Sequence, residues 1–442
     1  MAPLYFIFSI GNLMDIRVSP CNRLEGTITA QPSKNYTTRY LLASALAEGE
    51  SLVRRPAKSD DAAALISCLR ALGAEIVEQG DGCRVRGFGR RPRNPGVINP
   101  HNAGAVLRFL LGTGALLPEV RFITDFPESL GKRPNADILD ALAQLGVKSE
   151  SDNGRLPITL YGGNLRGGKI TVSGEKSSQF LSSLLFLAPL IGERVEIAVV
   201  GNLKSKAAVW QTLDVIREAG IDIKADDALA SFVIEGGQRY QPRVYEVNGD
   251  WPGSAAVLAA AAVSPESDVA INGLCGDRQG ERAIVDVLAA MGADIAFENR
   301  SARVRGGGML RSVEFDGDKA TDAVLAMVGA ACLAQGTSRF FNVENLRLKE
   351  CDRIAEPLGE LAKLGVRASE KRDEIIIEGN PAGFAGGMAL NGRGDHRVIM
   401  LLTIVGIRTQ KGIIIEGAEH IAKSYPDFFR HMESLGAKFE YI

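Results

Sequence analysis

The sequence lacks several features that mark common classes of binding protein. Its six cysteines include no CxxC pair and its four histidines show no metal-ligand spacing, so we predict no metal site and no redox motif. Lysine and arginine (51) nearly balance aspartate and glutamate (53), for a net charge of −2. This balance argues against a general nucleic-acid-binding protein. Any local cluster of basic residues therefore marks a site.

Long hydrophobic runs and nucleotide-binding motifs are equally scarce. The apolar patch at residues 4–10 is too short to span a membrane, and the first basic residue is Arg17, so the basic start of a signal peptide is missing. No GxxxxGK[ST] stretch is present, and the glycine-rich run at 162–168 lacks a GxGxxG fingerprint. With scattered cysteines, these absences predict a cytoplasmic protein with no nucleic-acid or membrane partner.

What the sequence does contain is a sixfold repeat. A glycine after an apolar residue ends a helical pattern six times, and successive glycines are 73, 74, 72, 73 and 71 residues apart. A chain of 442 residues is also too long for one ordinary core, so two domains are expected. The glycines are Gly73, Gly146, Gly220, Gly292, Gly365 and Gly436.

The first copy shows what each repeat contains. We predict a strand at 27–30, a helix at 37–47, a strand at 51–55, a helix capped by Ser59, and two strands at 75–78 and 83–86. The fourth copy has the same order. We therefore predict an α/β protein of six β-α-β-α-β-β repeats, grouped as three plus three into two domains with a cleft between them. The alternative is an α/β chain whose rhythm is accidental.

Basic side chains recur at the predicted helix starts of these repeats. Helix N-termini bind anions, but an exposed helix dipole contributes only about 0.3–1 kcal/mol. A hydrogen bond to a charged group contributes about 1.5–3 kcal/mol, so the side chains must dominate. This pattern predicts small substrates that carry phosphate and carboxylate groups. The residues are Lys34, Arg39, Arg108, Arg133, Lys349, Arg353, Arg397 and Lys423.

Each of these motifs also has a purely structural interpretation. Ser177-Ser178 can be an N-cap, 102–104 a turn, 349–353 a solvated mixed-charge helix start, and 395–397 a structural ion pair. Their recurrence at one phase of the repeat favours a shared site over four unrelated coincidences.

Seven short motifs, in this order along the chain, resemble those of the enolpyruvyl transferases. They are PSK with an arginine five residues after the lysine, NAG followed by LR, KRP, SSQF, NLRLKECDR, GDHR and KSYPDFF. The resemblance covers nearly the full length. It implies the inside-out α/β barrel of that family, with one domain at 33–247, a second formed by 1–32 plus 248–442, and hinge strands near 30–34 and 246–250.

Within the family, the resemblance is to the enzymes that act on shikimate 3-phosphate. It implies transfer of the enolpyruvyl group of phosphoenolpyruvate to the 5-hydroxyl of shikimate 3-phosphate, with release of phosphate and no cofactor or metal. It also implies a monomer, with the 33–247 domain on the shikimate-phosphate side.

The resemblance assigns roles to individual residues. The implied catalytic residues are Asp322, as base or hydroxyl anchor, Glu350, as proton donor and acceptor, and Lys34 and Lys423. A carboxylate among so many cations suits a base, whereas an acid needs burial or a second carboxylate nearby. The implied phosphoenolpyruvate contacts are Lys34, Asn102, Gly104, Arg133, Gln179, Arg353, Arg397 and Lys423. The implied shikimate 3-phosphate contacts are Asn35, Arg39, Ser177, Ser178, Gln179, Ser205, Asp322, Asn345 and Lys349.

Three residues depart from the family pattern. Asn35 replaces the usual Ser, Ala105 the usual Thr, and Ala208 a usual Tyr near the ring of the acceptor. These departures leave open a divergent transferase with another hydroxylated acceptor, or a non-catalytic relative that binds anions. The sister UDP-N-acetylglucosamine enolpyruvyl transferase has a loop Cys between its second and third repeats, and this sequence has none between Cys83 and Cys275.

Overall fold

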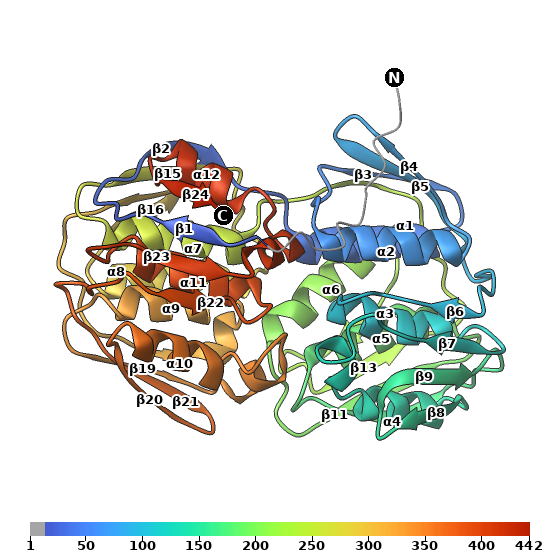
Figure 1. Cartoon of the computed structure of the whole chain (residues 1–442). Coiled ribbons are helices and arrows are strands. Elements are labelled where there is room, and N and C mark those ends of the chain that lie inside the picture. Colours follow the sequence, from blue (N-terminus) through green and yellow to red (C-terminus); the bar gives the residue numbers. More distant parts are fainter. Residues whose placement is uncertain (1–13) are drawn as a thin grey trace. The chain divides into compact units, whose positions relative to one another are not determined.

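The computed structural model describes residues 14–442, so the apolar patch at 4–10 lies outside the described residues. The chain forms two compact units (Figure 1). We call Pro32–Asn248 the continuous unit, and we call residues 14–31 together with Gly249–Ile442 the split unit. The sequence placed the domain boundaries near 33 and 247; the structure divides the chain after Gln31 and after Asn248.

Each unit contains three four-stranded sheets of one topology. The first strand runs parallel to the second, and the third and fourth follow in antiparallel order. In the continuous unit the sheets are β14 (Val244–Glu246), β3 (Glu50–Arg54), β5 (Gly82–Arg86) and β4 (Glu75–Gln79); β6 (Val97–Ile98), β7 (Val120–Phe122), β9 (Arg155–Tyr161) and β8 (Lys148–Asp152); and β10 (Gly168–Ser173), β11 (Val195–Val200), β13 (Ser231–Ile234) and β12 (Lys224–Ala225).

The split unit repeats this arrangement, which confirms the predicted β-α-β-α-β-β repeat. Its sheets are β2 (Glu25–Thr29), β15 (Asp268–Asn272), β17 (Ser301–Arg305) and β16 (Asp294–Glu298); β18 (Glu314–Asp316), β19 (Thr337–Phe341), β21 (Glu374–Glu378) and β20 (Arg367–Lys371); and β22 (Ala389–Asn391), β23 (Ile413–Glu416), β1 (Ile16–Val18) and β24 (Phe439–Tyr441).

The predicted first strand belongs to a different repeat. The strand expected at 27–30 is β2, and it pairs in parallel with β15 of the fourth repeat, with Ile28 opposite Ile271. The first repeat instead takes β14, which follows the third repeat, with Tyr245 opposite Val53. Strand β1, which was not predicted, completes the sixth sheet. Sequence rhythm identifies a strand but not its distant partner, so the prediction was wrong about this pairing.

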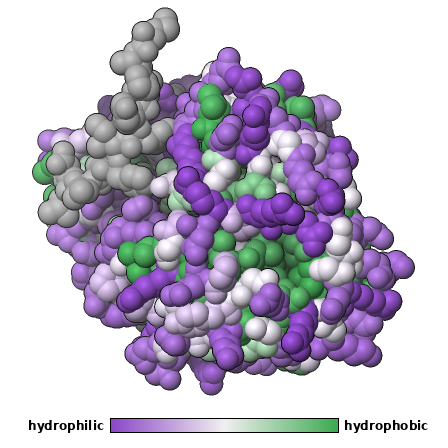
Figure 2. Space-filling model, turned by 90° about the vertical axis from the view of Figure 1, so that its right-hand side faces the viewer, coloured by the Kyte–Doolittle hydropathy of each residue, from purple (hydrophilic) through white to green (hydrophobic). Residues whose placement is uncertain are grey.

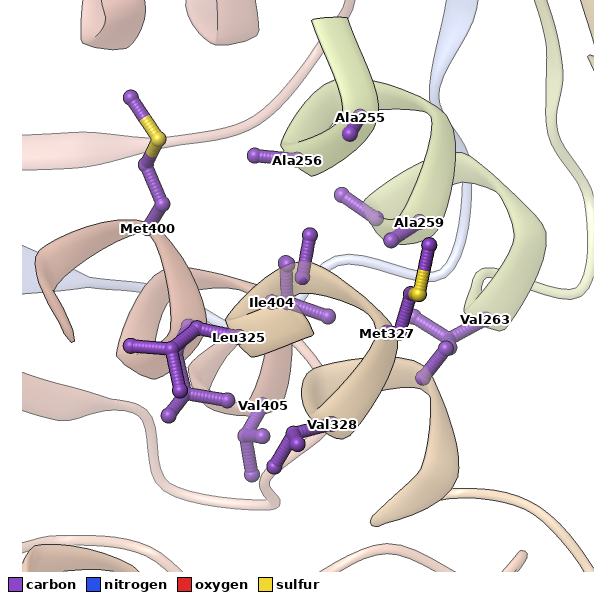
Figure 3. Packing of buried hydrophobic residues seen from close by; sticks show 14 of the residues in the cluster. Ala255, Ala256, Ala259, Val263, Leu325, Met327, Val328, Met400, Ile404 and Val405 are labelled. Carbon is purple, nitrogen blue, oxygen red and sulfur yellow. The ribbon is translucent and has the colours of Figure 1, made fainter. Parts of the chain in front are cut away.

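The first helix of each repeat is buried, as the sequence predicted. In the split unit α7, α9 and α11 pack on one another, and every residue of α7 is buried. Figure 3 shows Ala259 of α7 close to Met327 of α9, with Ile404 of α11 in the same cluster. The helices are α1 (Lys34–Leu46), α3 (Gly104–Gly114), α5 (Ser178–Leu187), α7 (Trp251–Val263), α9 (Val324–Ala331) and α11 (His396–Gly406).

The second helix of each repeat buries one face and exposes the other. These helices are α2 (Asp60–Ala71), α4 (Ala136–Gln144), α6 (Lys206–Glu218), α8 (Ile284–Ala290), α10 (Ala355–Lys363) and α12 (Phe428–Ser434). The short 3-10 helices are η1 (Leu130–Lys132), η2 (Ala188–Leu190), η3 (Gly280–Ala283), η4 (Gly317–Ala320), η5 (Glu344–Leu348) and η6 (Ala418–Lys423). All six repeat glycines follow one of the second helices with a φ between +86° and +106°, a conformation that favours glycine.

Three predicted starts of second helices are wrong. Arg133, Lys349 and Lys423 end η1, η5 and η6, whereas α4, α10 and α12 begin three to six residues later, at Ala136, Ala355 and Phe428. Pro134 and Pro426 are one physical reason, because the residue before a proline avoids the helical conformation. The backbones of these three residues therefore do not lie at the N-terminus of a second helix, so any anion that they bind is held by their side chains.

The face in Figure 2 is mostly hydrophilic, with small apolar patches. Within residues 14–442, no helix combines the length and apolar character needed to cross a bilayer.

Candidate functional site

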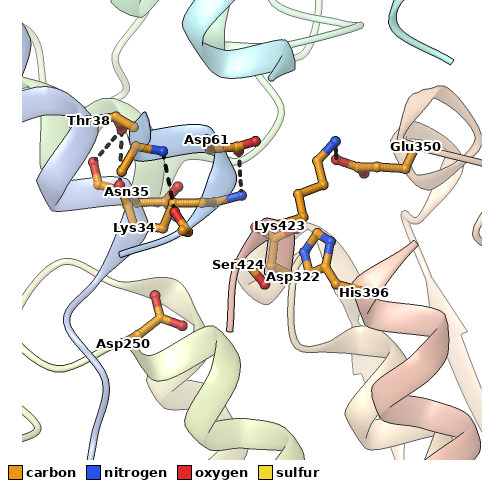
Figure 4. Close-up of polar contacts among 12 residues, drawn as sticks. Lys34, Asn35, Thr38, Asp61, Asp250, Asp322, Glu350, His396, Lys423 and Ser424 are labelled. Atoms are coloured by element: carbon orange, nitrogen blue, oxygen red, sulfur yellow. Dashed lines mark hydrogen bonds and ion pairs between the residues drawn. The ribbon is translucent and has the colours of Figure 1, made fainter. Parts of the chain in front are cut away.

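In the continuous unit, Lys34 is held by a buried acid. Ser33 caps α1, and Lys34 is the first residue of that helix. Its Nζ lies 2.9 Å from Oδ2 of Asp61, in the first turn of α2 (Figure 4). The exposed fractions of the two side chains are 14% and 5%, so this ion pair fixes the lysine in a largely dry setting. No sequence motif marked Asp61.

Arg39 is locked by uncharged acceptors. Its Nε donates to Oγ1 of Thr212 (2.9 Å), Nη1 to the carbonyl oxygen of Asn35 (2.9 Å) and Nη2 to that of Ala208 (3.1 Å). The guanidinium also lies 5.2 Å from the ring centre of Phe109. Asn35 and Ala208, two of the three departures from the family pattern, thus contact Arg39 through their backbone carbonyl oxygens. Any residue at those positions would supply the same oxygens.

Arg108 joins the starts of α3 and α5. Its Nη1 donates to Oε1 of Gln179 (2.8 Å) and to Oγ of Ser177 (3.1 Å). Ser177 is also the N-cap of α5, because its side chain accepts from the N–H of Gln179. The interpretation of Ser177 as an N-cap is therefore correct, and the same serine also accepts from Arg108. Ser178, the first residue of α5, is buried.

Gly104 begins α3 beside Arg133. The N-cap, Ala103, makes no side-chain hydrogen bond, and Asn102 precedes it in the turn. A Cβ built on Gly104 would overlap Nη1 of Arg133, whose side chain is buried. The glycine therefore makes room for this guanidinium at a helix N-terminus. Ser205 occupies the N-cap position of α6 in the left-handed conformation, with a φ of 52°.

In the split unit, Arg353 binds three carboxylates at once. Its Nη1 lies 3.0 Å from Asp322, its Nη2 2.7 Å from Glu350, and its Nε 2.7 Å from Asp395. The Arg353 side chain is 2% exposed. These carboxylates raise its pKa above the ordinary value although burial opposes this. Arg353 therefore fixes, relative to one another, a side chain that precedes α9, one that follows η5 and the N-cap of α11.

Glu350 joins this group to Lys423. Its Oε1 lies 3.3 Å from Nζ of Lys423, and both side chains are less than 10% exposed (Figure 4). One carboxylate is thus held between an ammonium and a guanidinium, in a buried setting where these interactions are strong. An ammonium in contact with a carboxylate is a usable proton donor and acceptor pair.

Asp395 and Arg397 are placed by the start of α11. Asp395 caps this helix by accepting from the N–H of Arg397 (2.8 Å), and it also binds Arg353. The ion pair of Asp395 is therefore with Arg353, 42 residues away, whereas Arg397 reaches Asp395 through its backbone N–H. Arg397 is buried, its Nη1 lies 3.6 Å from the sulfur of Met400, and its Nε has no hydrogen-bond partner among residues 14–442. A buried cation in this state suits an anionic ligand.

Asn345 lies buried in η5, and Lys349 follows that turn. Cys351 lies between Glu350 and Arg353 in the sequence, and burial together with Asp395 raises the pKa of its thiol. This thiol stays protonated at neutral pH and is no nucleophile. Among residues 14–442, no three histidine, cysteine or acidic side chains are grouped in a way that would hold a metal ion.

Comparison with known proteins places the chain in a family. The family description "EPSP synthase (3-phosphoshikimate 1-carboxyvinyltransferase)" matches residues 18–432. The chain belongs to the EPSP synthase family. An EPSP synthase relative from Deinococcus radiodurans, named 3-phosphoshikimate 1-carboxyvinyltransferase, is 50% identical over 97% of each chain. A relative of the same name from Burkholderia pseudomallei is 38% identical over 96% of this chain and 94% of its own.

Solved structures agree on the fold. An EPSP synthase from Acinetobacter baumannii superposes with a TM-score of 0.81 at 24% identity, covering 97% of this chain and all of that one. The enolpyruvyl transferase NikO from Streptomyces tendae gives a TM-score of 0.79 at 18% identity, over 98% and 99% of the two chains. The predicted two-domain α/β architecture of the enolpyruvyl transferases is therefore confirmed.

Proposed function

We propose that this chain transfers the enolpyruvyl group of phosphoenolpyruvate to the 5-hydroxyl of shikimate 3-phosphate and releases phosphate. Family membership supports the reaction class. The observation that carries the assignment is the cluster of the buried Glu350, Arg353 and Lys423 with the partly exposed Asp322. It supplies two carboxylates and a proton-donating ammonium in fixed positions.

The reaction is an addition followed by an elimination. Asp322 accepts the proton of the acceptor hydroxyl while the hydroxyl oxygen bonds to C2 of phosphoenolpyruvate. A proton from the Glu350–Lys423 pair is added to C3. The tetrahedral intermediate then loses phosphate from C2 and a proton from the C3 methyl group, which restores the double bond; the proton that Asp322 took from the hydroxyl leaves with the phosphate. The proton that Glu350 and Lys423 donate in the first step returns to them in the second.

The substrate contacts follow from the charge of each group. For phosphoenolpyruvate we propose Lys34, Asn102, Gly104, Arg133, Gln179, Arg353, Arg397 and Lys423. For shikimate 3-phosphate we propose Asn35, Arg39, Ser177, Ser178, Gln179, Ser205, Asp322, Asn345 and Lys349. Arg353 acts mainly by holding Asp322 and Glu350, since its guanidinium is buried among three carboxylates.

The acid–base cluster separates this proposal from that of a non-catalytic anion binder. Asp322 and Glu350 add negative charge next to the cations, which would weaken the binding of an anion and has no use without proton transfer. We also propose that the enzyme is cytoplasmic and acts as a monomer. A sedimentation measurement tests the monomeric state.

The test is to mix the protein with phosphoenolpyruvate and shikimate 3-phosphate and to follow phosphate release. Release that needs both substrates is expected. Release only with another hydroxylated acceptor would point to a divergent transferase and would implicate Asn35, Ala105 and Ala208. Tight binding without release would point to a binder.

A further inference from the structure

Glu281 is a buried carboxyl group that the proposed reaction does not use. It lies in η3, its residue is 8% exposed, and η3 packs against α7, α8 and η4. Its Oε1 accepts a hydrogen bond from the backbone N–H of Asp322, at 3.3 Å. No motif in the sequence drew attention to this residue. The side chain of Glu281 thus contacts the peptide of the proposed base.

Asp322 is consequently held from two sides. Glu281 binds its N–H, while Nη1 of Arg353 binds its carboxylate at 3.0 Å. The Asp322 side chain is still 26% exposed, so a substrate can reach it. These two contacts fix the orientation of the short segment between η4 and α9 that carries Asp322. Proton transfer requires a base that is held in one orientation.

The charges around Glu281 oppose its ionisation. Burial and, to a smaller extent, the nearby Asp322 carboxylate raise the pKa of Glu281 to about 7, although Arg397 opposes this rise. The packed elements add Asp318 and Lys319 on η4 and Asp286 on α8, whereas α7 carries no charged residue. Glu281 therefore changes charge near neutral pH, next to the proposed base.

We propose that Glu281 is a positioning residue for Asp322: it fixes the Asp322 peptide and, when it loses its proton, makes the Asp322 carboxylate a stronger proton acceptor. This inference rests on the proposed function, in which Asp322 takes the proton of the acceptor hydroxyl. The electrostatic reason is that two nearby negative charges repel, and protonation of Asp322 relieves the repulsion.

Three variants separate the two parts of this role. Glu281→Gln keeps an oxygen that can accept from Asp322 but never becomes charged, while Glu281→Ala removes both features. Glu360→Gln is the matched control, because Glu360 is also a fully buried carboxylate of the split unit but pairs with Lys363 and Arg393. A melting curve for each variant establishes that it is folded.

In steady-state kinetics from about pH 5.5 to 9, wild-type kcat should rise through an ionisation near pH 7. Glu281→Gln should lose that step and fall about tenfold in kcat at pH 8, with both KM values within about threefold of wild type. Glu281→Ala should lose on the order of 100-fold, because the Asp322 peptide is also released. Glu360→Gln should keep the wild-type pH profile even if it melts earlier.

A second measurement tests Glu281 without relying on turnover. In protein labelled with 15N-aspartate, the amide signal of Asp322 should titrate near pH 7 in wild type and not in Glu281→Gln. A wild-type protein that releases no phosphate would count against the proposed function, while this titration would still decide whether Glu281 acts on Asp322. Glu281→Gln with wild-type kinetics at every pH, or an Asp322 amide that titrates as in wild type, would overturn the inference.

Discussion

Arg39 and Arg108 of the continuous unit have different partners from Arg353 and Lys423 of the split unit. In the continuous unit, Arg39 and Arg108 donate to a hydroxyl, an amide oxygen and backbone carbonyls, all of them uncharged. In the split unit, Arg353 and Lys423 contact carboxylates. Neutral acceptors orient a guanidinium without cancelling its charge, whereas carboxylates cancel the charge and add groups that can accept a proton.

This difference indicates a division of labour within a single repeated fold. Cations with neutral partners keep their attraction for a phosphate or carboxylate. In the proposed reaction, cations paired with acids hold those acids in position for proton transfer. Lys34 and Arg397 are departures from the division within the site: Lys34 pairs with Asp61 in the continuous unit, and Arg397 in the split unit contacts the sulfur of Met400. The predictions below test both the rule and these departures.

The largest effect is expected from Lys423→Met. It removes the ammonium that contacts Glu350, and loss of a positioned acid or base costs about 10²- to 10⁴-fold in rate. We expect kcat to fall at least 10³-fold, measured as phosphate release. Lys363→Met is the control, since Lys363 also pairs with a buried glutamate, Glu360, but is 51% exposed. A near-normal kcat in Lys423→Met would contradict the proposed acid–base role of the split unit.

Arg397→Met should act on binding. Its buried guanidinium suits a substrate anion, and a hydrogen bond to a charged group is worth about 1.5–3 kcal/mol, or roughly 10- to 150-fold in affinity. We expect KM for phosphoenolpyruvate to rise within that range, with no loss in melting temperature. Arg372→Met removes an exposed arginine that pairs with Glu344 and should leave KM unchanged. An unaltered KM in Arg397→Met would mean that this arginine is structural.

Gly104→Ala should have a smaller effect. The new methyl group would overlap Nη1 of Arg133. This atom must therefore move, and it can do so because it lies at the end of a flexible side chain. We expect KM for phosphoenolpyruvate to rise about tenfold, consistent with one weakened charged hydrogen bond. Gly192→Ala in the same unit is the control, since a Cβ there meets nothing within 4 Å. Equal kinetics for the two variants would show that Arg133 takes no part in binding.

The smallest effect is expected from a carboxylate of the split unit that lies outside the cluster. Arg339 and Lys371 lower the pKa of Glu374 to about 2. The native state therefore gains stability from this group above pH 4.5, and loses it as the pH falls toward 2. In Glu374→Gln we expect a slightly lower melting temperature at pH 7, no change in kcat, and a shallower decline of melting temperature in acid. A clear loss of kcat would mean that acids outside the cluster also serve the reaction.

The repeat and most site residues could be predicted from local signals. The six glycines gave the period, because a helix that ends in the left-handed conformation needs glycine. The pairing of β2 with β15 could not be predicted, since it joins segments more than 230 residues apart. Asp61 and Glu281 were missed for the same reason: each is an acid on a helical turn whose role depends on one distant contact.

The division of labour is tested most directly by titrating shikimate 3-phosphate into Glu350→Gln and Arg39→Gln proteins, each first shown to be folded, in a calorimeter. We expect Glu350→Gln to bind with an affinity within about threefold of wild type while releasing no phosphate in the turnover assay. We expect Arg39→Gln to lose at least tenfold in affinity, the cost of one charged hydrogen bond. Weak binding by Glu350→Gln together with normal binding by Arg39→Gln would contradict the account.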